Sequence, residues 1–259
     1  MPNRSGTRLT VDLGNTRCKF RLWGESGSLE QSLDLAVDAE FLVQAMDWLK
    51  GLDGLERVAL CAVAELELED QLKEVLVHVV GERFLEDPDV ALELDCSHAE
   101  TIGRDRLFAA RGAIERTGRT CIVVDCGTAL TVDLVLVADG VGTFAGGAIA
   151  PGPELLAKAL RAGGARLPEV EPVPNAPALG KHTRAALEAG IAVGLRGAAR
   201  ELVRELAKQV PGETPPVVLT GGAAGFLTGG AALADEVVEV PDLVHLGLLA
   251  AIDRASKTA

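Results

Sequence analysis

The sequence predicts a duplicated α/β protein with two lobes and a cleft between them. Two segments carry nearly the same pattern, Val-Asp-Leu-Gly-Asn-Thr at 11–16 and Val-Asp-Cys-Gly-Thr-Ala at 124–129. Each follows an apolar run typical of a strand, and each precedes a second strand-like run, at 19–23 and at 130–137. The order of strand, glycine turn and strand therefore occurs once in each half of the chain.

The first half has the pattern of a hairpin-led sheet followed by helices. Apolar residues recur at helical spacing over 39–50, and the segment 65–80 carries its charges on one face. A short apolar piece follows within 81–89. In chain order we expect strands at 9–11, 19–23, 33–37 and 57–63, and helices at 39–50, 65–80 and 104–116.

The second half repeats this theme, and we place the boundary near Gly118, which gives domains 1–118 and 119–259. A proline suited to a first helical turn opens one helix, and the proline-rich segment 167–178 predicts an extended loop. Here we expect strands at 120–124, 130–138, 142–149, 215–220 and 237–240, and helices at 151–161, 183–209 and 243–255.

Composition sets limits on the partners. The chain has 259 residues, 48% of them hydrophobic, which is typical of a globular protein with a sizeable core. Its formal net charge of −13 argues against nucleic acid as the main partner, because a phosphate backbone demands clustered Lys and Arg. It does not argue against ATP, which arrives with magnesium and needs only local positive charge.

Cysteine usage and hydropathy predict the compartment. Five cysteines form an odd count without a Cys-x-x-Cys pair, which favours buried thiols in a reducing environment. No apolar stretch is long enough to span a bilayer, and the first residues lead directly into a strand. We therefore expect a cytoplasmic protein that has no membrane partner.

Each glycine turn combines a carboxylate with backbone N–H groups that can approach a phosphate closely. Asp12 is suited to bind magnesium, and Gly14, Asn15 and Thr16 can hold phosphate oxygens. Lys19 would add positive charge, although it also fits an exposed strand residue. Either turn alone fits an ordinary hairpin. Two turns that face each other would bracket the phosphates of a nucleotide.

Other nucleotide and hydrolase motifs are excluded. Gly140 to Ala145 fits a loose dinucleotide fingerprint, but this segment lies between two predicted strands and opens no helix. The chain has no Gly-x-x-x-x-Gly-Lys-Ser/Thr loop, which excludes a P-loop kinase, and no Gly-x-Ser-x-Gly nucleophile elbow.

With these motifs in view, the chain resembles the type III pantothenate kinases. This family belongs to the superfamily of acetate kinase, sugar kinases, Hsp70 and actin, so the resemblance implies two duplicated ribonuclease-H-like (actin-like ATPase) domains. The resemblance covers nearly the full length. The matching segments are Asp12 to Thr16 with Lys19, Gly103 to Arg106, Asp125 to Thr131, Gly146 to Gly152, Thr183, Thr220 to Gly222 and Leu246 to Leu248.

For the nucleotide, the resemblance implies that the two turns hold ATP as cosubstrate. It implies that Gly127 and Thr128 belong to the second phosphate turn, and that a monovalent cation, potassium or ammonium, lies near Asp125. Gly221 and Gly222 end a predicted strand and resemble the turn that contacts adenosine, although they also fit a plain turn.

For the reaction, Asp105 is the candidate general base. It lies at the start of a predicted helix, where the dipole favours an ionised carboxylate, and stabilisation of the helix end is the alternative explanation. The Gly-x-Asp-Arg motif implies that Asp105 deprotonates the pantothenate hydroxyl in the first step of coenzyme A biosynthesis. It also implies substrate contacts for Gly103, Arg104 and Arg106.

Further substrate contacts follow from the resemblance. Gly147 is expected beside the substrate, and Thr183 resembles a residue that family dimers contribute across the subunit interface, so a homodimer is expected. Family members usually carry a Tyr seven residues before the Gly of Gly-x-Asp-Arg, but this chain has Cys96 there and contains no Tyr. Cysteine supplies neither an aromatic wall nor a phenolic hydrogen bond.

Three functions are therefore compared. The first is phosphorylation of pantothenate by ATP. The second, motivated by Cys96, is a kinase of the same superfamily that acts on a different small acceptor. The third is a non-catalytic accessory role in regulation, against which the three intact carboxylates of Asp12, Asp105 and Asp125 argue.

Overall fold

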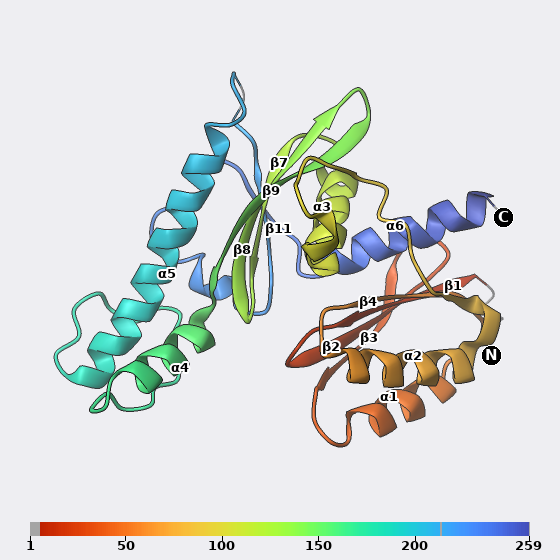
Figure 1. Ribbon diagram of the computed structural model, residues 1–259, viewed down its shortest axis with the longest axis horizontal. Helices are drawn as coiled ribbons and strands as arrows, with labels where there is room; N and C mark the ends of the chain where they lie inside the picture. Colours follow the sequence, from red (N-terminus) through yellow and green to blue (C-terminus); the bar gives the residue numbers. More distant parts are fainter. Residues whose placement is uncertain (1–5, 213, 259) are drawn as a thin grey trace. The chain divides into compact units, whose positions relative to one another are not determined.

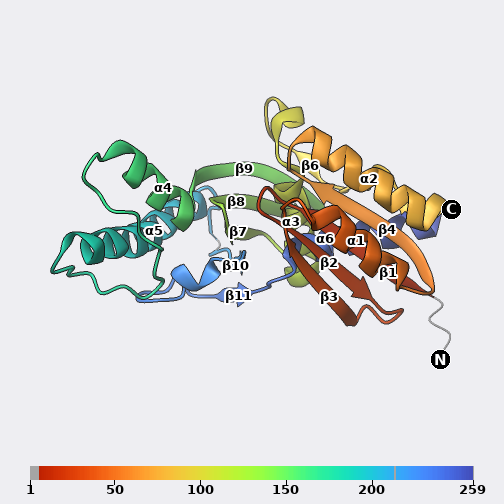
Figure 2. The ribbon, with the colours of Figure 1, turned by 90° about the horizontal axis from the view of Figure 1, so that it is seen from below.

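The structure is a computed structural model that describes residues 6–212 and 214–258. The chain divides into two compact units. Unit 1 comprises Met1–Leu92, His98–Arg116 and Leu243–Ala259, and unit 2 comprises Glu93–Ser97 and Thr117–Asp242. Each unit has its own sheet and its own apolar core (Figure 1, Figure 2). Both units are α/β layers, as the sequence predicts.

Over the described residues, unit 1 holds a five-stranded sheet in the order β3-β2-β1-β4-β5. The hairpin strands β1, β2 and β3 pair antiparallel, whereas β4 runs parallel to β1 and β5 parallel to β4. The carboxyl ends of β1, β4 and β5 therefore lie at one edge. The strands are β1 Thr7–Leu13, β2 Arg17–Trp23, β3 Leu29–Ala36, β4 Leu55–Ala62 and β5 Phe84–Leu85.

Alternation along β1 gives the sheet an apolar face and a polar face. Leu9, Val11 and Leu13 are fully buried in one core with residues of α1 (Phe41–Lys50) and α2 (Leu66–Val80). Thr10 and Asp12 point to the opposite face, where α6 (Leu243–Thr258) lies against β1 and β4 (Figure 1). Short 3-10 turns cover Gly81–Arg83 and Ala99–Thr101, and α3 covers Arg104–Thr117.

A buried polar network fixes α6 on this face. His245 of α6 lies 2.9 Å from the Thr10 hydroxyl through its Nδ1 atom, and the Trp23 indole N–H donates to the same hydroxyl at 2.8 Å. Burial lowers the pKa of His245, and the charges of Arg21 and Lys19 lower it further. The imidazole ring is therefore uncharged at neutral pH. It can hydrogen-bond to the Thr10 hydroxyl without placing a charge in the core.

Two glycines let α3 and α6 touch. A Cβ atom at Gly112 would overlap the carbonyl oxygen of Leu243, and one at Gly247 would overlap the carbonyl oxygen of Phe108. The closing helix groups with unit 1 because it packs on β1 and β4, and this contact and the His245 hydrogen bond add to that packing. The boundary that we expect from sequence, near Gly118, assigns this helix to the domain 119–259.

The sheet of unit 2 repeats the topology of the first. Over the described residues its order is β11-β10-β7-β8-β9-β6, so β9-β8-β7-β10-β11 matches the order of β3-β2-β1-β4-β5. The pairing senses match as well, with an antiparallel hairpin and parallel β10 and β11. The strands are β7 Cys121–Cys126, β8 Ala129–Ala138, β9 Val141–Pro151, β10 Val217–Thr220, β11 Val237–Glu239 and β6 Glu93–Leu94. This duplication is the one that the two turn motifs predict.

One face of this sheet packs against helices. Side chains of α5 (Thr183–Ala207) share a core with β7, β8 and β10, and α4 (Pro153–Gly163) packs on α5 and β9 (Figure 2). A 3-10 turn covers Ala224–Phe226. The two-residue strand β6 joins β9 in parallel, which explains why residues 93–97 group with unit 2 although they precede the predicted boundary.

The contact between α3 and α6 predicts a stability effect. Gly112→Ala should lower the free energy of unfolding by about 1–3 kcal/mol, because the added methyl group overlaps a backbone carbonyl that cannot rotate away. Gly163→Ala in α4 is the matched control, since no atom lies within 4 Å of its Cβ position, and it should be neutral or slightly stabilising. Urea unfolding measures both variants, and equal stability of the two would contradict the packing argument.

Candidate active site

The first glycine turn lies at the carboxyl end of β1. Asp12 is half-buried and lies opposite Lys19 of β2 and Cys61 of β4 in the strand register, so these three side chains share the polar face. The N–H of Gly14 donates to the carbonyl oxygen of Arg17 at 2.9 Å, which closes the turn. A carboxylate and a lysine thus stand side by side behind an exposed turn at Asn15 and Thr16.

Asp105 lies in the first turn of α3, and its Oδ1 atom accepts the backbone N–H of Arg106 at 2.8 Å. Burial raises the pKa of this carboxyl, while the hydrogen bond from Arg106 and the Arg106 charge lower it in part. A carboxylate that is partly desolvated binds a proton more readily than one in water. Burial therefore makes Asp105 more basic than an exposed aspartate would be.

Gly103 leaves space for that carboxylate. A Cβ atom at residue 103 would lie 2.5 Å from Asp105 Oδ1 and 3.9 Å from Cγ1 of Val63. Val63 follows β4, and its N–H donates to the carbonyl oxygen of Leu13 at 3.0 Å. In unit 1, the end of β4 therefore lies between the end of β1 on one side and the start of α3 on the other.

The carboxylates of Asp12 and Asp105 both affect the pKa of the Cys61 thiol. Burial raises its pKa well above the usual value, and the charges of Asp12 and Asp105 raise it further. Both carboxylates thus lie close enough to act on one thiol, although they are more than ninety residues apart in sequence. The thiol stays neutral, so it is not a nucleophile here.

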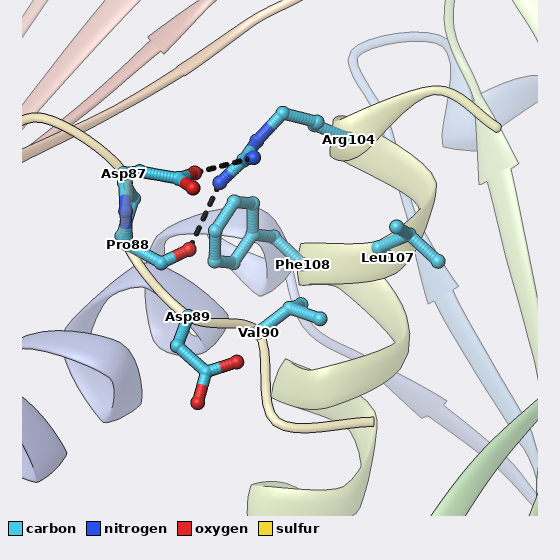
Figure 3. A pocket seen from close by; sticks show the side chains of 7 residues that line it. All are labelled: Asp87, Pro88, Asp89, Val90, Arg104, Leu107 and Phe108. Atoms are coloured by element: carbon cyan, nitrogen blue, oxygen red, sulfur yellow. Dashed lines mark hydrogen bonds and ion pairs between the residues drawn. The ribbon is translucent and has the colours of Figure 1, made fainter. Parts of the chain in front are cut away.

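Arg104 points into a pocket on the segment that follows β5. Its guanidinium donates to Asp87 Oδ1 at 2.8 Å and to the carbonyl oxygen of Pro88 at 2.9 Å (Figure 3). It also lies over the ring of Phe108, 5.4 Å from the centroid. The pocket has a volume of about 230 Å³ and is lined by Asp87, Pro88, Asp89, Val90, Arg104, Leu107 and Phe108.

The second glycine turn lies at the carboxyl end of β7 in unit 2. The N–H of Gly127 donates to the carbonyl oxygen of Ala129 at 2.9 Å, so this turn is one residue tighter than the first, where Gly14 donates to Arg17. Asp125 is half-buried, and Thr128 is exposed and accepts the N–H of Gly152 through its carbonyl oxygen at 3.0 Å. Burial, with a contribution from the Asp125 charge, raises the pKa of the Cys126 thiol to about 12.

The segment after β10 packs directly on this turn. Gly221 has a φ of +99°, and a Cβ atom there would overlap Asp125 Oδ1 and the carbonyl oxygen of Cys126. The N–H of Ala223 donates to that carbonyl at 2.8 Å. By contrast, no atom lies within 4 Å of the Cβ position of Gly222. Unit 2 therefore brings Asp125, Gly127 and Gly221 together in one site.

The other predicted substrate residues of unit 2 occupy two places. The Cys96 thiol lies 3.8 Å from the carbonyl oxygen of Phe144, next to Gly146 on β9. Gly147 packs so tightly against Asp133 and the Val132 carbonyl of β8 that a side chain would not fit. Thr183 is the exposed first residue of α5. The side chain of His182, and not Thr183, caps the helix by accepting the N–H of Ala185.

Two contacts of the site are not evident from sequence. The partners of Arg104 lie 16 and 17 residues before it, on a segment with no regular structure. The pairing of β6 with β9 places Cys96 beside Phe144 through a strand of only two residues. The one available signal was the alternation of Asp and Pro at 87–89, which predicts a turn that could present acceptors.

The donor set fits a magnesium ion that arrives with a nucleotide. Within the described residues, no three His, Cys, Asp or Glu side chains form a group that could hold a metal ion by themselves. Magnesium does not need such a cage, because it keeps several waters and is held by one or two carboxylates together with substrate phosphates. Asp12, beside an exposed turn, can supply one carboxylate of this kind.

The length and polarity of the helices indicate whether any of them could span a membrane. In the part of the chain that the structure describes, no helix combines the length and the apolar character that crossing a membrane requires.

Comparison with known proteins shows which family this chain is similar to. The family model described as type III pantothenate kinase matches residues 8–205. Type III pantothenate kinase from Streptomyces coelicolor is 31% identical, with 95% of this chain and 97% of that protein covered. The protein of the same name from Thermus thermophilus is 35% identical, with 93% and 96% covered.

The fold has counterparts among solved structures. A protein from Campylobacter jejuni, described as belonging to the Baf family of transcriptional activators, has a TM-score of 0.60 and 20% sequence identity. The match covers 96% of this chain and 99% of that one. At this identity the likeness supports the fold alone. The fold is that of two ribonuclease-H-like domains, as the repeated strand order indicates.

The neighbouring glycines after β10 give a matched pair of variants. Gly221→Ala should lower the free energy of unfolding by about 2 kcal/mol or more, because it combines a left-handed backbone with overlap on Asp125. Gly222→Ala should stay within about 0.5 kcal/mol of the parent. Thermal unfolding compares them, and a Gly221→Ala protein as stable as the Gly222→Ala protein would show that the turn tolerates a side chain.

Proposed function

The chain belongs to the type III pantothenate kinase family, and from this premise we propose that it transfers the γ-phosphoryl group of ATP directly to the pantothenate hydroxyl, with Asp105 as general base. The activity is the phosphorylation of pantothenate in coenzyme A biosynthesis, which makes the protein a phosphotransferase. The observation that carries the proposed mechanism is the position of the half-buried Asp105 carboxylate at the start of α3, next to Gly103 and Val63 at the end of β4.

Asp105 would take the hydroxyl proton as the γ-phosphoryl group of ATP moves in line to the acceptor oxygen and ADP leaves. Phosphoryl transfer requires positioning, neutralisation of charge and a group that accepts the proton of the nucleophile. The carboxylate must lie within about 3 Å of that oxygen, or reach it through one water. No covalent phospho-enzyme is needed for this route.

The two turns supply the nucleotide contacts in the proposal. We assign phosphate oxygens to the exposed turn of Gly14, Asn15 and Thr16, with Lys19 as the adjacent positive charge. Asp12 would hold magnesium, which neutralises phosphate charge when it is bound. In unit 2, Gly127 and Thr128 would contact phosphate, and Gly221 and Gly222 would contact adenosine.

Asp125 is our candidate for the monovalent cation, potassium or ammonium. Its carboxylate lies beside the carbonyl oxygen of Cys126, and both pack against Gly221. Oxygen ligands of this kind suit a hard cation. Such an ion would add positive charge to a chain whose formal net charge is −13.

For the acceptor, we assign pantothenate contacts to Gly103, Arg106, Cys96 and Gly147. Cys96 replaces the Tyr that is usual in the family, and this motivates the alternative of another small acceptor. Family membership favours pantothenate over that alternative. It also argues against a purely regulatory role, and the Baf description belongs to a relative at 20% identity.

We also propose a homodimer and a cytoplasmic location. The exposed side of α5 carries Gly190, Val193 and Gly194, and no atom lies within 4 Å of either glycine's Cβ position. A second subunit could pack closely there and would bring its Thr183 to the pantothenate site. The five cysteines are free, which suits a reducing compartment.

Asp105→Asn tests the base. The variant should lose at least about a hundredfold in kcat with pantothenate, because general-base catalysis contributes at least that much. ATP binding should survive, and the fold should be at least as stable, because the buried charge is gone. Coupled ADP release measures kcat, and calorimetric ATP titration measures binding. Near-normal turnover in this variant would remove Asp105 from the mechanism.

The pH profile tests the environment of that carboxylate. A base must be ionised, so kcat should fall tenfold per pH unit below the pKa of Asp105. Burial raises this pKa, so the acid limb should have its midpoint above the ordinary Asp value of about 3.9. The residual rate of Asp105→Asn should lack the limb. A limb that persists in this variant would belong to ATP or to another residue.

A further inference from the structure

We propose that Arg104 is a positioning residue for Asp105, because it clamps the first turn of α3 onto the segment 87–90. The inference rests on the proposed function, since it takes Asp105 as the general base. The resemblance implied that Arg104 contacts the substrate, whereas its observed contacts assign it a different task.

Three contacts hold the guanidinium of Arg104 (Figure 3). One Nη atom donates to Asp87 Oδ1 at 2.8 Å, and the other donates to the carbonyl oxygen of Pro88 at 2.9 Å. The Cζ atom of the guanidinium lies over the Phe108 ring, one helical turn further along α3, at 5.4 Å from the ring centroid. A planar fork whose two Nη atoms both donate, and which also contacts an aromatic ring, is restricted in orientation.

The first turn of α3 needs such a support. The N–H groups of Arg106 and Leu107 both turn to the carbonyl oxygen of Gly103, at 3.1 Å and 3.4 Å. The second distance is long for an N–H···O bond. A glycine also precedes the turn and leaves its entry backbone free. The Asp105 carboxylate accepts the Arg106 N–H, so it moves with this turn.

The segment 87–91 is a fixed partner for the clamp. Pro88 is buried, and the N–H of Ala91 donates to Asp89 Oδ1 at 2.9 Å. Arg111 of α3 reaches the Ala91 carbonyl at 3.5 Å, and Arg254 of α6 pairs with Asp89 at 3.6 Å. The segment also follows β5, which pairs with β4. Arg104 therefore ties the base to the same sheet that carries Asp12.

The exposure of Arg104 and Asp87 lets an experiment distinguish an effect on the position of Asp105 from an effect on the free energy of unfolding. The side chain of Arg104 is 44% exposed and that of Asp87 is 85% exposed. Ion pairs this exposed contribute little to the free energy of unfolding, because water screens them. A small displacement of a reacting group, by contrast, can lower the rate strongly. Loss of the clamp should therefore reduce kcat without unfolding the protein.

The experiment compares Arg104→Met, Asp87→Ala and the double variant in the full chain. Methionine keeps an apolar stem over Phe108 but has no donors, and alanine at the exposed position 87 removes the acceptor. Arg116→Met is the matched control, since it removes an exposed arginine from the last turn of the same helix. Steady-state kinetics with pantothenate and Mg-ATP give kcat and both KM values, and thermal unfolding gives Tm.

We expect Arg104→Met to lower kcat about tenfold, with both KM values within about twofold and Tm within about 2 °C of the parent. Asp87→Ala should lower kcat in the same direction. The double variant should be no worse than Arg104→Met, because both changes break one clamp. Arg116→Met should match the parent in all three quantities.

Other outcomes overturn the inference. A large rise in KM for pantothenate at constant kcat would make Arg104 a substrate ligand. A fall in Tm of many degrees would make it a structural residue, and an unchanged kcat would leave it without a role in the reaction. A parent protein that does not phosphorylate pantothenate would instead contradict the proposed function itself.

Discussion

The parallel pairing of β1 with β4 is the constraint on which the candidate site depends. It places Asp12 and Cys61 side by side at the carboxyl edge of the sheet, and Val63 continues the ladder by donating to Leu13. Gly103 can then pack against Val63, which brings Asp105 to the same edge. Ligands of open α/β sheets bind at this edge, because loops from several strands converge there. A hairpin without β4 would present the first turn but not the base.

The same edge holds a carboxylate in a place that costs stability. Burial raises the pKa of Asp105, and the backbone N–H groups of Arg106 and Asp105, together with the Arg106 charge, offset this in part. Functional groups are commonly held in environments that the fold alone would not select. Two neighbours make room for the Asp105 carboxylate. Gly103 has no side chain that would overlap it, and Cys61 is a neutral thiol that adds no further negative charge. The local chemistry thus depends as much on small or uncharged neighbours as on the acids.

Much of this architecture can be predicted from sequence, and the reasons are local. The two hairpins are evident because a glycine turn between apolar runs has few alternatives, and α1 and α2 are evident from helical periodicity. The grouping of α6 with unit 1 is not evident, because it depends on tertiary packing against β1 and β4 and on the fit between Gly112 and Gly247, which lie 135 positions apart in the chain. Strand β6 has only two residues and carries no periodic signal. The partners of Arg104 are tertiary contacts with the segment after β5, which the Gly-x-Asp-Arg motif does not predict.

The most direct test of this account is a crystal structure with a non-hydrolysable ATP analogue, magnesium and pantothenate. The account predicts that an Asp105 carboxylate oxygen lies within about 3 Å of the acceptor hydroxyl, directly or through one water, with Asp12 in the coordination sphere of magnesium or bonded to its waters. A hydroxyl that is bonded to another side chain, with Asp105 beyond the reach of one water, would contradict it.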